Sequence, residues 1–199
     1  GLVHTDSSGR IVGFAEKPPL SHCVTDLANT GIYILSPSVL DLIDSGKSVD
    51  FASDVFPQML RQGMPIFAYE DAGYWCDIGD LNSYVSCQRD ILTGRVRTRL
   101  RTEGGMHCEE EPPRGSFELI PPVYIGRNVR IGAAAVVGPF AVLDDGCQVG
   151  NSARIKGSVL LPSSYAGDRS SLSGALLCHG ASVHRGASLF EGAAVGADS

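Results

Sequence analysis

The sequence of 199 residues lacks an apolar run long enough to cross a bilayer, and aromatic residues make up only 7% of it. Since a spanning helix needs about 20 consecutive apolar residues, we expect a soluble, globular protein without membrane contact. The sequence also lacks an excess of positive charge, with a formal net charge of −6 at pH 7. Broad binding to nucleic acid is therefore not expected, and any bound anion must be held by a few local cations.

The sequence has no closely spaced cysteine pair. Its six cysteines lie far apart, without a CxxC motif or clustered histidines: Cys23, Cys76, Cys87, Cys108, Cys147 and Cys178. Such spacing argues against a structural zinc site. A chain of this length does not need disulfide bonds for its stability, so we expect reduced thiols and a cytoplasmic location.

Glycine and proline, in contrast, are frequent, with 24 and 11 residues, which favours tight turns over long helices. From about residue 122 the sequence has a period of six. Large aliphatic residues recur at Ile125, Ile131, Val137, Leu143, Val149, Ile155 and Leu161. After a step of five residues the pattern continues at Ala166 and Leu172, and after a second such step at Leu177, Val183, Leu189 and Val195.

A period of six fits neither an amphipathic helix nor simple strand alternation, so it predicts short strands joined by repeated corners. Each repeat points one aliphatic side chain into a narrow core, and a glycine often follows it at the corner. We therefore expect a parallel β-helix over residues 122–199. The pattern is still running at Val195, so we expect the repeat to be cut short at the C-terminus.

Residues 1–93 alternate between strand and helix patterns, as in an α/β domain. Strands are predicted over residues 10–16, 29–35, 64–70 and 73–79. Helices are predicted over residues 36–46, 50–63 and 80–94, the last of them capped by Asp80 and closed by Gly94.

The segment 94–121 is charged and rich in glycine and proline, and it is predicted to be a linker crossing the surface. Four arginines alternate at its start: Arg95, Arg97, Arg99 and Arg101. No aromatic residues lie between these arginines, and glutamates follow closely. The arginines therefore indicate the solvent-exposed face of an edge strand and not a nucleic-acid site.

Three short stretches hold polar residues that suit a binding site. Glu16 and Lys17 stand side by side in "GFAEKPPL", before prolines that restrict the backbone, although a solvated turn is the alternative. Asn29 and Thr30 begin "NTGIYIL", as part of a simple turn or as partners for hydroxyl groups. Asp77 lies between a predicted strand and a glycine-containing turn, where it either caps that turn or meets a hard divalent cation.

The motifs "VGFAEKP", "LANTGIYILSP", "DFASDVFP" and "GYWCDIGDLNSY", in this order and before hexapeptide coils, resemble the sugar-1-phosphate nucleotidyltransferases. The resemblance is nearest to the mannose-1-phosphate guanylyltransferase-like branch. It implies that residues 1–93 form the C-terminal, sugar-phosphate half of an α/β nucleotide-diphospho-sugar transferase domain. It also implies that the β-helix is left-handed, and that the parent enzyme is a nucleotidyltransferase.

In this family a sugar-1-phosphate attacks the α-phosphate of a nucleoside triphosphate and releases pyrophosphate; the branch implies GTP and mannose-1-phosphate, with Mg²⁺ as cofactor. By resemblance Lys17 contacts the sugar phosphate, and Glu16 accepts hydrogen bonds from the sugar ring. Asn29 and Thr30 line the sugar pocket, and Asp77 binds the metal, so that Lys17 and Asp77 are the catalytic pair.

The family's glycine-rich nucleotide-binding loop has no counterpart in this sequence. We therefore expect an interior fragment of a longer enzyme, inactive by itself, with exposed apolar side chains in residues 1–93. Flat coil faces offer large repetitive surfaces, so we expect the β-helix to mediate homo-oligomer formation.

Two alternatives stay open. One is a pyrophosphorylase-like regulatory or assembly subunit that keeps the sugar pocket without catalysis. The other is a hexapeptide acyltransferase that uses His179 or His184 as a general base. Both histidines lie among regular coils without an inserted loop, which favours simple surface positions for them.

Overall fold

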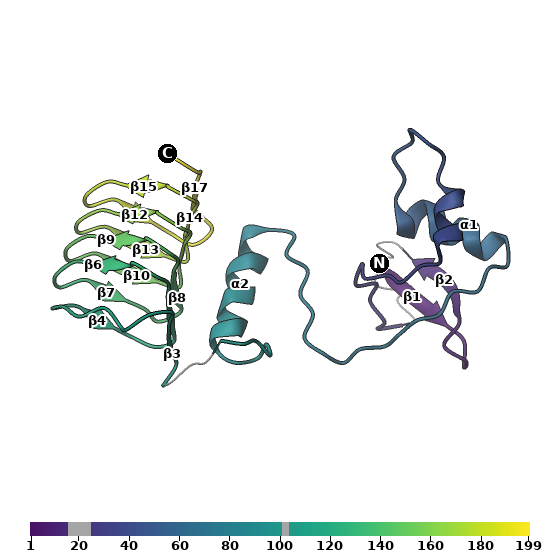
Figure 1. Ribbon diagram of the computed structural model, residues 1–199, viewed down its shortest axis with the longest axis horizontal. Helices are drawn as coiled ribbons and strands as arrows, with labels where there is room; N and C mark the ends of the chain where they lie inside the picture. The colour runs from purple at the N-terminus through teal and green to yellow at the C-terminus, as the bar shows by residue number, and fades with distance from the viewer. Residues whose placement is uncertain (16–24, 101–103) are drawn as a thin grey trace. The chain divides into compact units, whose positions relative to one another are not determined.

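The structure is a computed structural model that describes residues 1–15, 25–100 and 104–199. It divides into two units, Gly1–Trp75 and Cys76–Ser199, whose positions relative to one another are not determined (Figure 1). Each unit is therefore described by itself. Within the described ranges, none of the helices has both the length and the apolar character that a membrane crossing requires.

The first unit contains an antiparallel hairpin of β1 (Leu2–Thr5) and β2 (Ile11–Ala15). Its turn is held by Asp6, whose side chain accepts a hydrogen bond from the backbone N of Ser8 at 2.8 Å. Gly9 completes the turn with a φ of 79°, a conformation that favours glycine. As far as the described residues extend, β2 confirms the strand predicted over residues 10–16.

Three short helical segments of different geometry follow: the 3₁₀-helix η2 (Pro37–Leu42), the π-helical turn η3 (Phe51–Val55) and the α-helix α1 (Phe56–Arg61). They confirm the helices predicted over residues 36–46 and 50–63. Pro57 is the second residue of α1, directly after the π-helical turn. The main buried cluster of this unit consists of Val39, Val55, Phe56 and Met59, and Val3 and Ile11 of the hairpin are buried as well.

The strands predicted over residues 29–35, 64–70 and 73–79 are not formed. The structure has only isolated bridges near them, at Ala28 and Phe67. A strand forms where its backbone N–H and C=O groups can pair with a neighbouring strand. Alternating apolar residues provide suitable side chains, but they do not provide that neighbour. The alternation itself persists, because Leu35 packs on the core while Ile34 is fully exposed. The expected exposure of apolar side chains in residues 1–93 is thereby confirmed.

The second unit begins before its solenoid with α2 (Leu81–Leu92). The side chain of Asp80 caps this helix by accepting a hydrogen bond from the backbone N of Ser83 at 2.7 Å. Gly94 follows the last turn with a φ of 76°. The helix predicted over residues 80–94, its cap and its closing glycine are therefore confirmed.

The solenoid consists of three parallel sheets stacked coil upon coil (Figure 1). The first sheet contains β3 (Met106–Cys108), β5 (Val123–Ile125), β8 (Ala141–Leu143), β11 (Val159–Leu160), β14 (Leu176–Leu177) and β17 (Ala194–Val195). The second contains β4 (Glu118–Leu119), β7 (Val136–Val137), β10 (Arg154–Lys156), β13 (Ser171–Ser173) and β16 (Ser188–Leu189). The third contains β6 (Arg130–Ile131), β9 (Gln148–Val149), β12 (Tyr165–Ala166) and β15 (Ser182–Val183).

The solenoid starts earlier than the period of six indicates. Its first strands, β3 and β4, lie inside the segment 94–121 that the sequence suggests as a linker. β3 pairs with β5, and Met106 and Cys108 pack against the solenoid core. No strand forms in the described part of the arginine stretch, residues 95–100, so the edge strand predicted there is wrong.

The register of the first sheet places one residue of the predicted pattern differently. Leu143 pairs with Leu160, which is fully buried, whereas the predicted core residue Leu161 is only partly buried and packs on the cluster beneath α2. The shorter step of five residues therefore lies between Ile155 and Leu160. Gly157 turns this corner with a φ of 56°, and this conformation lets the chain close the corner with one residue fewer.

α2 covers the outer face of the first sheet. Leu92 forms a buried cluster with Val142, Val159 and Leu176, which precede the inward-facing residues of their strands. At the side of this cluster, the guanidinium carbon of Arg89 lies 4.8 Å from the centre of the Phe140 ring, in a cation–π contact. The helix is thereby an integral part of the second unit.

Glycine after a core aliphatic residue lets neighbouring coils stack closely. A Cβ added to Gly132 would lie 2.6 Å from the backbone N of Asn151 in the next coil, far inside van der Waals contact. Gly196 has the same place in the repeat, after Val195, but no atom lies within 4 Å of a Cβ added there. The steric requirement for glycine thus differs between the two positions.

A polar cluster joins the first two strands of the first sheet. The rings of His107 and Tyr124 stack at 5.2 Å, and the Oε1 atom of Glu109 lies 3.0 Å from Nε2 of His107. The same oxygen accepts a hydrogen bond from the Tyr124 hydroxyl at 3.3 Å. Burial raises the pKa of Tyr124 to about 12, and the Glu109 and Asp144 carboxylates add to this shift.

We predict that Gly132→Ala destabilises the solenoid by about 1–3 kcal/mol, because the new methyl group overpacks against backbone atoms. Urea denaturation followed by circular dichroism measures the change. The matched control is Gly196→Ala, which should leave the unfolding midpoint nearly unchanged. Equal midpoints for the two variants would contradict the close stacking at Gly132.

We further predict that Tyr124 stays protonated well above pH 10, the value near which an unfolded tyrosine titrates. Because the folded pKa is raised, this residue's contribution to stability is complete below pH 10 and is lost as the pH rises toward 12. The absorbance at 295 nm of the folded wild type minus that of Tyr124→Phe isolates the titration. A midpoint near pH 10 in this difference would rule out the burial argument.

Candidate functional site

A cavity of about 270 Å³ opens in the first unit, beside the end of β2. Its walls come from the hairpin, from the segment around Asn29 and from the helical segments η3 and α1. The lining residues are Gly1, Leu2, Phe14, Ala15, Asn29, Ala52, Ser53 and Pro57. The wall is mostly apolar, with the side chains of Asn29 and Ser53 as polar groups, a composition typical of small-molecule sites.

Asn29 is fixed by hydrogen bonds at both its backbone and its side chain. Its backbone N donates to the carbonyl oxygen of Gly1 at 2.9 Å. Its Oδ1 atom accepts from the backbone N of Gly31 at 3.2 Å and from the Tyr33 hydroxyl at 3.0 Å. Gly31 has a φ of 77°, so the predicted Asn-Thr-Gly turn is confirmed.

The π-helical turn η3 brings Ala52 and Ser53 to the cavity. Asp50 caps it by accepting a hydrogen bond from the backbone N of Ser53 at 2.7 Å, and its own backbone N donates to Oδ2 of Asp54 at 2.8 Å. The hydrogen bonds from the Ser53 backbone and hydroxyl lower the pKa of Asp50. π-Helical turns are rare and recur at functional sites, which makes this wall of the cavity notable.

An aromatic cluster supports the cavity from the core side. The ring of Phe56 is buried, and it stacks on Phe14 at 5.1 Å and meets the edge of Tyr33 at 4.8 Å. Phe51 packs against both Tyr33 and Phe56 at 5.7 Å. Since Phe14 lines the cavity and Tyr33 bonds to Asn29, this cluster fixes two parts of the site at once.

The structure places the predicted site residues unequally. Asn29 lines the cavity, whereas Thr30 is exposed and is not among the lining residues. Glu16 and Lys17 follow β2 directly and lie outside the described residues. Asp77 belongs to the second unit, where it is exposed, so its place beside the cavity stays a prediction.

Ser53 and Ala52 are wall residues that the sequence did not predict. The available signal was Asp50, three residues before Ser53, in the spacing of a helix cap. That spacing predicts where a helix begins. It does not predict that the first turn is π-helical or that it faces a cavity.

The structure describes candidate metal ligands in residues 1–15, 25–100 and 104–199. No group of three or more His, Cys, Asp or Glu side chains suited to a metal ion occurs among the described residues. The exposed carboxylate of Asp77 is compatible with Mg²⁺, which commonly takes only one or two protein carboxylates and completes its shell with phosphate oxygens and water.

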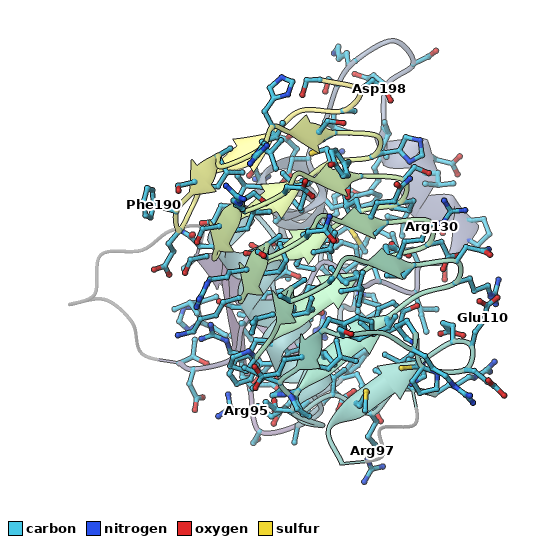
Figure 2. All side chains as sticks on the ribbon, turned by 90° about the vertical axis from the view of Figure 1, so that its left-hand side faces the viewer. Arg95, Arg97, Glu110, Arg130, Phe190 and Asp198 are labelled. Carbon is cyan, nitrogen blue, oxygen red and sulfur yellow. The ribbon has the colours of Figure 1, made fainter. Side chains whose placement is uncertain are left out.

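The other residues considered for chemistry lie on the surface of the second unit. His179 and His184 are exposed, as predicted. Arg95 forms an ion pair with Asp90 at 3.1 Å, and Figure 2 shows Arg95 and Arg97 on the outside of the solenoid near one end. These exposed positions give neither the two histidines nor Arg95 and Arg97 an enclosed pocket.

Comparisons with known proteins match both parts of the chain. Residues 1–94 match the family model of the nucleotidyl transferases, and residues 119–199 match the model described as the GMPPB C-terminal domain. A UTP–glucose-1-phosphate uridylyltransferase of Synechocystis sp. is 30% identical over 181 residues, which cover 85% of this chain and 47% of that protein.

Two further relatives carry different names. A glucose-1-phosphate adenylyltransferase of Desulfitobacterium hafniense is 30% identical over 82% of this chain and 43% of its own length. A mannose-1-phosphate guanylyltransferase of Mycobacterium tuberculosis is 32% identical over 80% of this chain and 40% of its own length. The chain thus spans less than half the length of each of these relatives.

We predict that Asp50→Ala loosens η3, because it removes the acceptor of the Ser53 backbone N–H. Hydrogen exchange measured by NMR should be at least about five-fold faster at Ser53, as expected for local opening. The pKa of Asp50 is lowered in the folded protein. The stabilisation by this cap is therefore fully present above the pKa of an unfolded aspartate, and it is lost as the pH falls through the folded pKa. Asp41→Ala, at an exposed position in η2, is the control, and unchanged exchange at Ser53 in Asp50→Ala would contradict the capping role.

Proposed function

We propose, from the premise that this chain belongs to the sugar-1-phosphate nucleotidyltransferase family, that its protein transfers GMP from GTP to mannose-1-phosphate and releases pyrophosphate. The observation that carries this proposal is the cavity beside β2. Its lining includes Asn29 and Ala15, and Ala15 is the residue that precedes Glu16 in the sequence.

The size and lining of the cavity suit a sugar ring. A volume of about 270 Å³ is close to the lower size of small-molecule pockets. Phe14, Ala15 and Pro57 offer apolar surface to the C–H faces of a sugar, and Asn29 and Ser53 offer polar groups to its hydroxyls. In this proposal Glu16 adds an acceptor for the ring hydroxyls and Thr30 a further polar contact at the rim.

Charge control is the main task of such a reaction, because two anionic substrates must approach one another. We assign Lys17 to the phosphate of the sugar-1-phosphate. Its ammonium group offsets the negative charge of this phosphate, whose oxygen is the attacking atom. Asp77 would hold Mg²⁺, which supplies neutralisation of the nucleotide phosphates when it is bound. Pro18 and Pro19 limit the conformations of the segment that carries Lys17.

The choice of GTP and mannose rests on the match of residues 119–199 to the GMPPB C-terminal domain and on the guanylyltransferase relative. Relatives named for UTP or for glucose-1-phosphate make other pairs the natural competitors. Pyrophosphate release measured for GTP, ATP and UTP, each with mannose-1-phosphate and glucose-1-phosphate, decides among them. A higher kcat/KM for any other pair would overturn the proposed specificity.

We also propose that the solenoid mediates self-association and that the protein is cytoplasmic. Phe190 supports the first point, since it is 72% exposed and projects from the edge of the solenoid (Figure 2). Light scattering of the wild type and of Phe190→Ser tests it, and equal masses at equal concentrations would remove this support. The second point is supported by free cysteines at Cys76, Cys87, Cys108, Cys147 and Cys178.

We predict that Lys17→Ala lowers kcat/KM for the sugar-1-phosphate by about 10- to 100-fold, the range of a lost charge-assisted hydrogen bond. Asp77→Ala should lower Mg²⁺-dependent turnover by more than about 100-fold, since metal neutralisation contributes several kcal/mol. Both effects are measured by pyrophosphate release, with the full-length natural protein. The control is Lys47→Ala, because Lys47 is exposed and pairs with Asp44 at 2.7 Å. Near-normal kinetics in both variants would overturn the assigned roles.

A further inference from the structure

The geometry points to Tyr33 as a positioning residue: we propose that its hydroxyl fixes the carboxamide of Asn29 so that the cavity meets the Nδ2 donor. This inference rests on the proposed function, since it concerns how the same cavity recognises a sugar-1-phosphate. It adds a residue outside the cavity wall and states which chemical group the wall presents.

Two donors point at the Oδ1 atom of Asn29. They are the backbone N of Gly31 at 3.2 Å and the Tyr33 hydroxyl at 3.0 Å. A carboxamide oxygen has two lone pairs, so these bonds use its acceptor capacity fully. Among the described residues no hydrogen bond is formed by Nδ2. The amide donor is therefore the group that Asn29 has left for a ligand in the cavity.

The backbone N–H of Gly31 determines which end of the carboxamide faces inward. It is a donor only, and a carboxamide rotated by 180° would bring Nδ2 against it, with two donors face to face. The bond at 3.2 Å is long for an N–H···O contact, however, and it spans only two residues. The second bond, from Tyr33, is what holds the group at this angle.

Tyr33 is itself held in place. Its ring meets the face of Phe56 at 83° and 4.8 Å and lies 5.7 Å from Phe51. Tyr33 is 37% exposed, and its hydroxyl reaches back four residues to Asn29. Aromatic packing of this kind leaves the hydroxyl little freedom, so it is a preorganised donor.

A fixed Nδ2 group selects for acceptor atoms in the ligand. The hydroxyl oxygens of a sugar and the oxygens of its phosphate both qualify, whereas an ammonium group has no lone pair to accept with. The cavity therefore favours sugar-1-phosphates with an uncharged hydroxyl at the position that meets Asn29 over those with a protonated amine there.

The test uses three variants of the full chain and mannose-1-phosphate as the probe. Tyr33→Phe keeps the ring and removes only the hydroxyl, and we expect about three- to ten-fold weaker binding by calorimetry, the size of one neutral hydrogen bond. Asn29→Asp keeps an oxygen for Gly31 and Tyr33 but replaces the donor, so binding should fall by more than about ten-fold. Tyr69→Phe is the matched control, since Tyr69 is 93% exposed, and its affinity should equal that of the wild type.

A second readout separates positioning from general stability. The side-chain amide of Asn29 should be ordered in ¹⁵N relaxation experiments on the free wild type and mobile in Tyr33→Phe, at equal melting temperatures. Wild-type affinity in Tyr33→Phe, or equal amide mobility in both proteins, would overturn the inference. A wild type that binds no sugar-1-phosphate would refute the proposed function instead, and the amide relaxation would then decide the inference by itself.

Discussion

The in-register stacking of aliphatic side chains is the constraint on which the second unit depends. Leu143, Leu160 and Leu177 pair successively along the first sheet, and all three are fully buried. A coil of this kind buries its apolar side chains only against its neighbours, so no coil is stable without the next. The residues just before them, Val142, Val159 and Leu176, point to the other face and form the cluster with α2. Alternate residues of the same short strands thus belong to two separate cores.

The first unit has a small core that depends on aromatic packing. Four aromatic rings, Phe14, Tyr33, Phe51 and Phe56, pack together where a few aliphatic side chains alone would leave gaps. The cavity lies against one edge of this cluster. Its polar groups are fixed by local hydrogen bonds within turns, at Asn29 and at the cap of η3. Phe14 belongs both to this cluster and to the cavity wall, so the aromatic packing directly borders the cavity.

Most of the solenoid could be predicted from the sequence, because its repeat is local and each period repeats the same steric demand. The error at Leu161 arose because Leu160 and Leu161 are both large aliphatics, and only the paired register decides between them. The helix α2 was predictable from Asp80 and Gly94, which signal its ends directly. The strands predicted over residues 29–35 and 64–70 failed for the opposite reason, since pairing depends on distant segments. For the site, Asn29 was predictable from its motif, but the contact of Tyr33 with it depends on the fold of the turn.

The length of the repeat varies by one residue at the edge of the solenoid between the second sheet and the first. The steps from Val137 to Leu143 and from Leu189 to Val195 contain six residues, and those from Ile155 to Leu160 and from Leu172 to Leu177 contain five. From Ile125 onward the steps across the other two edges all contain six. In the first coil those two edges together are one residue shorter, because Cys108 and Leu119, the partners of Ile125 and Val137, are 11 residues apart. The sheets on both sides stay in register across these unequal corners. Single-residue insertions and deletions are thus absorbed at this edge without propagating to later coils. We therefore expect natural variation in repeat length at this edge, which is also the best place to insert a foreign loop.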